Sequence, residues 1–146
     1  MVKRLAICVV ALLAIAPLRA HAQQKSPGAG PVIVLETSKG TIEFETYPEE
    51  APKTVARIVA LVKKNFYNGL RFHRAEPNFV IQIGDPVSRD YSRQAWWGRQ
   101  SSGHPIGVAE ITKKRRHVLK GQDVVAKIQK GDLLKRAYLK DETAKS

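Results

Sequence analysis

The sequence predicts a single, mainly β domain with a few helices. Short runs rich in β-branched residues recur along the chain and alternate apolar with polar positions, whereas only two segments carry apolar residues at helical spacing. The 146 residues, of which 43% are hydrophobic, suffice for one domain and contain no repeats. Cys8 is the only cysteine, so neither an intrachain disulfide nor a thiolate metal cluster can hold this fold together.

The first 22 residues have the pattern of a secretory signal peptide. Lys3 and Arg4 precede an apolar stretch over 5–17, and a small-x-small cleavage site ends at Ala22. The apolar stretch is shorter than the roughly 20 residues that span a bilayer. We therefore expect cleavage after Ala22, a periplasmic or secreted protein, and no membrane span in the mature chain. Residues 23–30 are small and polar, which predicts a disordered lead-in.

The chain is strongly basic. Its 25 Lys and Arg residues against 13 Asp and Glu residues give a formal charge of +12, or +9 without the three cations of the first 22 residues. A cationic exported protein favours anionic envelope surfaces as partners, because surface potential acts without specific contacts. Nucleic acid is not expected as a partner. Export makes the basic run at 113–116 unusable as a nuclear address, so we interpret that run as a solvated loop.

The ordered part is expected to begin with a hairpin and a helix. Residues 32–36 and 41–46 are β-branched runs joined by a short polar link, and the second alternates apolar with polar residues. This pattern predicts a hairpin with one buried face. Apolar residues then recur at helical spacing over 51–66, with Pro52 at a favourable first helical position. The helix is expected to end near Asn65.

Further short elements are expected in the second half of the chain. In chain order they are an extended pair at 70–75 and 78–84, an irregular segment at 87–107, a short strand near 108–112, a short helix at 121–130 and a last strand at 133–139. The irregular segment is rich in Gly, Ser and Arg. Its adjacent Trp96 and Trp97 are interpreted as covering a small patch of core, and a peptide or carbohydrate platform is the alternative.

The most informative stretch is 72–86, Phe-His-Arg-Ala-Glu-Pro-Asn-Phe-Val-Ile-Gln-Ile-Gly-Asp-Pro. It resembles the cyclophilin family of peptidyl-prolyl cis-trans isomerases, in which a Phe-His-Arg strand is followed by a Pro-x-Phe-x-x-Gln strand ending in Gly-Asp. The upstream order also fits: a hairpin, then Ala-Pro-x-Thr-Val leading a helix, then Tyr-x-Gly-x-x-Phe-His-Arg. These features cover 32–86. The resemblance implies a β-barrel capped by helices, isomerisation of X-Pro bonds in unfolded or exported polypeptides, and no metal or cofactor.

The resemblance also implies a site. Arg74 would donate to the prolyl nitrogen, where a lone pair develops as amide resonance is lost. Phe79 would form an apolar wall for the proline ring, Val80 would line the same pocket, and Gln82 would hydrogen-bond the substrate backbone. Arginine stays protonated at any working pH, so this donor does not titrate. His73 would be structural, because rotation about an amide requires no proton abstraction.

The residues alone leave another interpretation open. Strand alternation places Phe79 and Gln82 on opposite faces, so that only a bulge or a strong twist brings both to one cleft. In this interpretation Phe79 belongs to the core and Gln82 is an ordinary exposed strand residue. Arg74 is then a surface ion-pair partner of Glu76 or Asp85.

The pattern of the family is not continued after the stretch 72–86. A cyclophilin has further strands, among them a Ser-Gln-Phe-Phe strand, whereas this chain runs from the basic run almost directly into a late helix. We therefore expect a domain over 31–146 that lacks an internal block near 118–121. A barrel closes, and so removes its unpaired strand edges, only when all of its strands are present. Because central strands are missing here, the expected fold is an incomplete cyclophilin-like β-barrel. A non-catalytic module that binds proline peptides or acts as a chaperone, and a basic protein associated with envelope polyanions, are the alternative functions.

Overall fold

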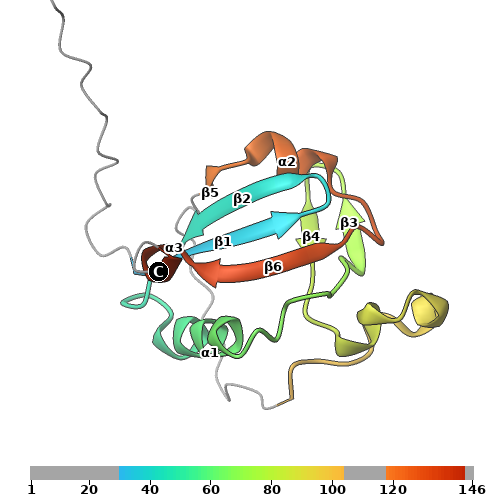
Figure 1. The fold of residues 1–146 in the computed structure, drawn as a ribbon, viewed down its shortest axis with the longest axis horizontal. Coiled ribbons are helices and arrows are strands. Elements are labelled where there is room, and N and C mark those ends of the chain that lie inside the picture. The colour runs from blue at the N-terminus through green and yellow to red at the C-terminus, as the bar shows by residue number, and fades with distance from the viewer. Residues whose placement is uncertain (1–29, 104–117, 144–146) are drawn as a thin grey trace, which may run out of the picture.

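The computed structural model describes residues 30–103 and 118–143, which form a four-stranded sheet, a separate two-stranded hairpin and several short helices (Figure 1). The expected signal peptide, the lead-in up to residue 29, the strand near 108–112 and the basic run at 113–116 lie outside the described residues. Gly30, expected in the lead-in, already belongs to the described fold, since its N–H donates to Thr46 O at 2.5 Å. None of the described helices has the length and apolar content needed to cross a bilayer.

The larger sheet has the strand order β5-β2-β1-β6, and all neighbouring strands are antiparallel. Its strands are β1 (Val32–Thr37), β2 (Gly40–Glu45), β5 (Val118–Lys120) and β6 (Leu134–Leu139). The β1–β2 hairpin and the last strand confirm the sequence prediction. The sequence did not predict β5, because three residues are too short to carry a periodic signal.

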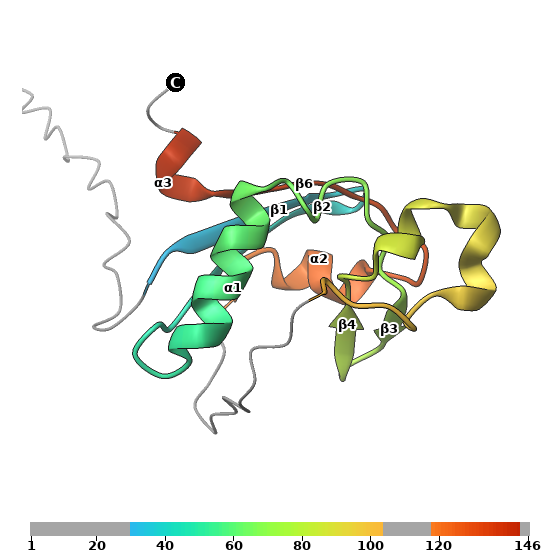
Figure 2. The same cartoon turned by 90° about the horizontal axis from the view of Figure 1, so that it is seen from below.

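Alternation along the strands gives this sheet one apolar face. Ile33, Ile42 and Ala137 lie in the core cluster, and Leu35 and Phe44 pack against it. Helix α1 (Pro52–Lys63) lies across this face. Helix α2 (Gln122–Lys127) and the hairpin of β3 (Arg74–Glu76) and β4 (Val80–Gln82) lie on the same side of the sheet (Figure 2). α1 buries Val55, Leu61 and Val62.

Helix α1 confirms the predicted helix and ends where the sequence indicates. Pro52 stands at its start, where a missing N–H costs nothing. Its last residue is Lys63, and Asn65 follows with a φ of 55°. Asparagine tolerates this left-handed conformation better than most residues. Asn65 therefore prevents the helix from continuing past Lys63 and Lys64.

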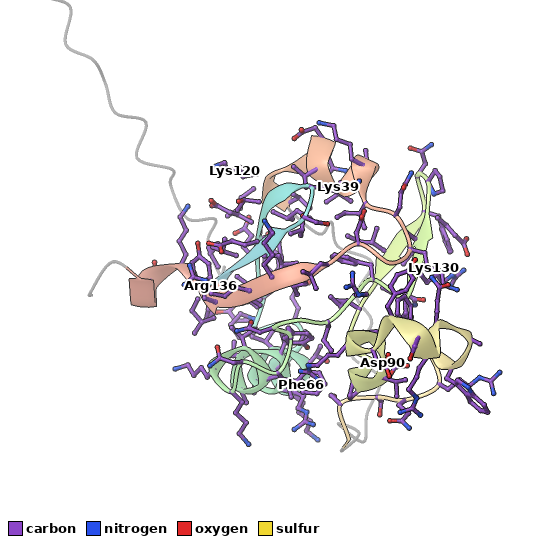
Figure 3. All side chains as sticks on the ribbon, turned by 45° about the vertical axis from the view of Figure 1, so that its right-hand side comes forward. Lys39, Phe66, Asp90, Lys120, Lys130 and Arg136 are labelled. Carbon is purple, nitrogen blue, oxygen red and sulfur yellow. The ribbon has the colours of Figure 1, made fainter. Side chains whose placement is uncertain are left out.

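Paired charges occupy the opposite face of the sheet. Glu36 on β1 accepts a hydrogen bond from Arg136 on β6 at 3.0 Å, and the buried Glu43 on β2 lies 2.6 Å from Lys140 Nζ. Lys120 on β5 lies 3.9 Å from the other oxygen of the Glu43 carboxylate. Figure 3 labels Lys120 and Arg136 on the two outer strands of this sheet. On this face ion pairs therefore join β1 to β6 and β2 to β5, whereas apolar side chains pack on the other face.

The short helix expected at 121–130 is present as α2 (Gln122–Lys127), and a last turn, α3 (Lys140–Thr143), follows β6. Val124 and Ile128 belong to the core cluster, as their spacing predicts. Gly121 joins β5 to α2 with a φ of 86°, at the place where the sequence indicates a missing block. The backbone of Gly121 passes so close to β2 that a Cβ atom there would overlap Thr41 O and lie 3.0 Å from Ile42 Cα.

We expect Gly121→Ala to lower the free energy of unfolding by about 2–3 kcal/mol, because the added methyl group meets backbone that cannot move aside and the positive φ adds strain. Chemical denaturation measures this difference. Gly69→Ala is the matched control: Gly69 has a φ of 77° but nothing within 4 Å of its Cβ position. Its expected cost is about 1 kcal/mol from the backbone strain alone. Equal costs for the two variants would contradict the close approach at Gly121.

The segment after Asp85 is more regular than the sequence indicates. It forms two 3-10 helices, η1 (Pro86–Arg89) and η2 (Tyr91–Trp96), so the prediction of an irregular segment is wrong over these residues. Each helix begins after an aspartate whose carboxylate accepts a backbone N–H two residues on: Asp85 from Val87 at 2.8 Å and Asp90 from Ser92 at 2.9 Å. Such short capped turns have no apolar periodicity, which is why the pattern did not reveal them.

The paired tryptophans separate into a buried and an exposed ring. Trp97 is buried, donates from Nε1 to Asp90 O at 3.1 Å and meets the Tyr91 ring edge-on at 5.6 Å. Trp96 is 56% exposed and lies under the Arg99 guanidinium. The interpretation as core cover is therefore confirmed for Trp97 and wrong for Trp96, because neighbouring residues of the turn point in different directions.

The described strands form two open sheets and do not close into a barrel. This confirms the expected fold class, mainly β with helices, and the expected incomplete barrel. The chain passes from β5 through Gly121 into α2 without the intervening strands that closure requires.

Candidate functional site

The predicted site residues Arg74, Phe79, Val80 and Gln82 lie on the β3–β4 hairpin. β3 (Arg74–Glu76) and β4 (Val80–Gln82) are antiparallel, with Arg74 opposite Gln82. Both strands are shorter than the predicted runs at 70–75 and 78–84. The residues before β3 run beside the start of β6 instead: Leu134 N donates to Leu70 O at 2.8 Å. Leu70 is fully buried, which anchors the hairpin to the larger sheet.

A tight turn removes Phe79 from strand alternation. Phe79 N donates to Glu76 O at 3.1 Å, and Asn78 adopts a φ of 59°. Phe79 therefore precedes β4, so the alternation that would place it opposite Gln82 does not apply. Its side chain is 76% exposed. The alternative that Phe79 belongs to the core is wrong.

Arg74 joins the exposed side chains of the hairpin into one group. Its Cζ lies 5.7 Å from the centroid of the Phe79 ring, and its Nη1 donates to Gln82 Oε1 at 3.4 Å. Its Nε donates to Glu76 Oε1 at 2.7 Å, and its Nη2 lies 2.6 Å from the same oxygen. We call Arg74, Glu76, Phe79 and Gln82 the hairpin cluster. The ion pair with Glu76 and the proximity to Phe79 and Gln82 thus occur together.

The guanidinium of Arg74 retains donors for a further partner. Of its five N–H groups, Glu76 takes two and Gln82 takes one, which leaves two. The side chains of Arg74 and Glu76 are 45% and 49% exposed, so a ligand can reach them. The hairpin cluster therefore presents an oriented cationic donor beside an exposed aromatic ring. This arrangement suits a ligand in which an acceptor atom adjoins an apolar ring.

Val80 lies opposite Glu76 in the hairpin register, on the same face as Arg74 and Gln82. It is half-buried and lines a cavity beneath the hairpin, and Gln82 lines the same cavity. Gln82 is therefore the residue common to the cluster and the cavity. The shared proline pocket of Phe79 and Val80 stays a prediction. The roles of Arg74 and Gln82 toward a substrate also stay predictions.

The surroundings of His73 favour its neutral form. Burial lowers the pKa of its imidazole, although the Asp85 carboxylate acts in the opposite direction. Its Nδ1 is buried and has no hydrogen-bond partner among the described residues. The resemblance implies a structural role for His73, and the sequence carries no signal for this unpartnered nitrogen.

Glu76 is the residue whose importance the sequence reasoning missed. It was considered only as an alternative partner for Arg74, whereas in the structure it orients the same guanidinium that faces Phe79 and Gln82. The available signal was its spacing, because residues two apart on one strand share a face.

Comparison with known proteins gives a consistent result. A family model described as cyclophilin type peptidyl-prolyl cis-trans isomerase/CLD matches residues 32–117. The chain is 40% identical over 70 residues to peptidyl-prolyl cis-trans isomerase-like 1 of Mus musculus, a match that covers 48% of this chain and 42% of that protein. It is 43% identical over 65 residues to peptidyl-prolyl cis-trans isomerase-like 2 of Gibberella zeae, covering 44% of this chain and 11% of that protein.

Among solved structures, the chain is similar to the cyclophilin AquaCyp293 from Hirschia baltica, with 37% identity and a TM-score of 0.38, over 42% of this chain and 23% of that one. In each of these three relatives the matched part is less than half of the relative's own length.

Proposed function

Because the chain belongs to the cyclophilin-type peptidyl-prolyl cis-trans isomerase family, we propose that it accelerates rotation about X-Pro peptide bonds. The barrier to this rotation is about 20 kcal/mol, and the uncatalysed change takes tens to hundreds of seconds. It is therefore slow enough to limit folding. The proposed substrates are unfolded, proline-containing polypeptides.

The observation that carries this proposal is the position of Arg74 in the hairpin cluster. As the amide twists, resonance is lost and a lone pair develops on the prolyl nitrogen. A guanidinium N–H that donates to this nitrogen stabilises the twisted state more than the planar one, and only such a difference accelerates the reaction. Glu76 holds the guanidinium in place, and two of its N–H groups stay available.

Phe79 and Gln82 supply the contacts that hold the substrate in this proposal. The exposed Phe79 ring, whose centroid lies 5.7 Å from Arg74 Cζ, packs against the proline ring of the substrate. Gln82 uses its Oε1 to accept from Arg74, so its amide N–H groups can donate to a carbonyl oxygen of the substrate backbone. Val80 contributes apolar surface beside Gln82.

The direct test is the rate at which a short X-Pro peptide changes from cis to trans in the presence of the purified, full-length protein. Circular dichroism and a cooperative denaturation transition establish that the protein is folded. We expect the rate to rise linearly with protein concentration. A folded protein that leaves the rate unchanged would contradict the proposed function.

A second candidate function is the binding of proline peptides without acceleration. The open sheets and the 76% exposure of Phe79 favour it, because little encloses the substrate and orientation contributes much of a rate enhancement. Isothermal titration with the same peptide separates the two functions. Saturable binding by a protein that does not change the isomerisation rate would support the binding module.

We further propose that the protein acts outside the cytoplasm, in the periplasm or after secretion, on exported polypeptides. The pattern of the first 22 residues supports this proposal, and the net charge of +9 that remains without them favours association with anionic envelope surfaces. Cell fractionation with mass measurement of the recovered protein tests it. The expected N-terminus is Gln23, and an intact N-terminus in the cytoplasmic fraction would contradict export.

Glu76→Gln is expected to lower kcat/KM by up to about fivefold, since an exposed ion pair of this kind contributes at most about 1 kcal/mol to the position of its partner. Glu76 is a positioning residue here, so the affinity for a proline peptide should change less than the rate does. Kinetics together with peptide titration measure the two effects. Glu49→Gln, the same chemical change on an exposed turn outside the hairpin, is the control. Equal rates for both variants would contradict the role of Glu76.

A further inference from the structure

A cavity of about 450 Å³ lies between the apolar face of the larger sheet, helix α1 and strand β4. Its lining residues come from elements far apart in the chain: Ile33, Leu35, Phe44, Ile58, Val62, Tyr67, His73, Val80, Ile81, Gln82, Ile83 and Leu134. It is separate from the hairpin cluster except for Gln82. The volume falls in the range of about 300–1,000 Å³ that is usual for small-molecule sites.

The chemistry of the lining selects an uncharged ligand. Nine of the twelve lining residues are aliphatic or phenylalanine, and none of the twelve carries a formal charge at neutral pH. His73 is the one residue of the lining that titrates in this range, and burial lowers its pKa, which favours the neutral form. A charged ligand would lose its hydration without gaining an opposite charge in this lining, which is costly. An apolar molecule gains by leaving water.

Polar groups in the lining indicate that the ligand carries a hydrogen-bonding group. His73 Nδ1 is buried and has no partner among the described residues, a state that costs free energy because the nitrogen has lost its hydration without gaining a hydrogen bond. Burial also raises the pKa of the Tyr67 phenol, so that its hydroxyl stays protonated and can donate. Native structures rarely leave a buried polar atom unpaired without a reason.

We propose that this cavity binds one small, uncharged, largely apolar molecule that carries a single hydrogen-bonding group. Three observations converge on it: the volume, the apolar lining without formal charge, and the unpartnered nitrogen of His73. The cavity shares Val80 and Gln82 with the proposed substrate-binding residues. The proposal still does not require isomerase activity, because Arg74 and Phe79 do not line the cavity.

The probe for this site is N-phenylnaphthylamine, which is uncharged, has fused apolar rings and one N–H group, and becomes fluorescent in apolar surroundings. Titrated into the folded, full-length protein, it should bind saturably with one molecule per chain. Its sulfonated analogue, anilinonaphthalene sulfonate, should bind at least about tenfold more weakly, because the cavity offers no charge to pair with the sulfonate.

Two variants fill the cavity from different elements. Leu35→Trp on β1 and Ile58→Trp on α1 should each weaken the binding of the uncharged probe by about tenfold or more, because the added ring takes the volume that the probe needs. Lys135→Trp adds the same ring at an exposed position of β6 and should bind the probe as the wild type does. The rate of X-Pro isomerisation, measured on the same samples, reports separately on the hairpin cluster.

The proposal is overturned if the folded wild type does not bind the probe saturably, or if both filling variants bind it unchanged. The first result would mean that other atoms of the chain fill the cavity. If neither filling variant folds, nuclear Overhauser contacts in the wild-type complex decide. Contacts from the probe to the methyl groups of Leu35 or Ile58 would support the site, and their absence in a saturated complex would overturn it.

Discussion

Replacing Arg74 with alanine is expected to lower kcat/KM for X-Pro isomerisation by about a hundredfold or more, the usual effect of removing a positioned donor from a developing charge. The variant loses the only guanidinium that reaches both Phe79 and Gln82 among the described residues. Folding should be affected little, because the exposed pair of Arg74 with Glu76 contributes no more than about 1 kcal/mol. The rate of cis-to-trans conversion in a short peptide, with denaturation curves beside it, measures both effects.

Two further variants sharpen this experiment. Arg74→Lys keeps the positive charge but cannot contact Glu76 and Gln82 with separate nitrogens, so most of the activity should still be lost. Arg136→Ala removes an arginine from a comparable exposed ion pair, that with Glu36, on the far face of the sheet and should leave the rate unchanged. Full activity in Arg74→Ala would show that the hairpin cluster does not catalyse the rotation.

Asp85→Ala is expected to lower the free energy of unfolding by about 4 kcal/mol, since it removes a buried carboxylate that accepts from one buried and two partly buried backbone N–H groups. The Asp85 carboxylate is fully buried. It accepts from Val87 N at 2.8 Å through one oxygen, and from Gly98 N at 2.6 Å and Gln100 N at 3.4 Å through the other. Asp85 therefore connects the residues that follow β4 both to helix η1 and to the loop after helix η2.

Chemical denaturation near pH 7 measures this effect, and Asp90→Ala is its matched control. Asp90 also begins a 3-10 helix and accepts from Ser92, but its side chain is exposed, so Asp90→Ala is expected to cost clearly less than Asp85→Ala. Similar costs for Asp85→Ala and Asp90→Ala would contradict the role of Asp85 as a buried anchor.

The stabilisation from Asp85 should depend on pH in one direction. Burial by itself raises the pKa of the Asp85 carboxyl group, but the backbone N–H donors, with Val87 first, outweigh it and hold that pKa below its usual value. A group whose pKa is lower in the folded state stabilises fully above its unfolded pKa of about 3.9 and loses this contribution as the pH falls through the folded value. The stability difference between wild type and Asp85→Asn should therefore be constant from about pH 5 to 8 and shrink below about pH 4.

The hairpin β1–β2, helix α1, helix α2 and strand β6 were all predicted from the sequence. In each of them the apolar residues recur at a clear period, and Pro52 and Asn65 mark the ends of α1. Hydrophobic periodicity and helix-end residues are local properties of the sequence, so they can be recognised without knowing the tertiary contacts. The two 3-10 helices and β5 were missed because they are too short to show a period, and their stability comes from Asp85, Asp90 and pairing with β2.

The candidate site was predicted only in part. The motif around Phe-His-Arg indicated Arg74, Phe79 and Gln82, but strand alternation alone separated two of them. The left-handed Asn78 and the turn that it closes brought Phe79 to the side of Arg74. The function of Glu76 could not be read from its residue type, since an exposed glutamate on a strand is ordinary until its distance to Arg74 is known.

Local pattern was thus sufficient for the class of fold, for most of its elements and for the expectation of an incomplete barrel. The tertiary structure decided how Arg74 is oriented, that Asp85 is a buried anchor, and that a cavity with an unpartnered histidine nitrogen lies under the hairpin. The physical reason is the range of the interactions. Helix and strand propensities act between residues a few positions apart, whereas a hydrogen-bond cluster or a cavity depends on the separation in space of residues such as Leu35 and Ile83.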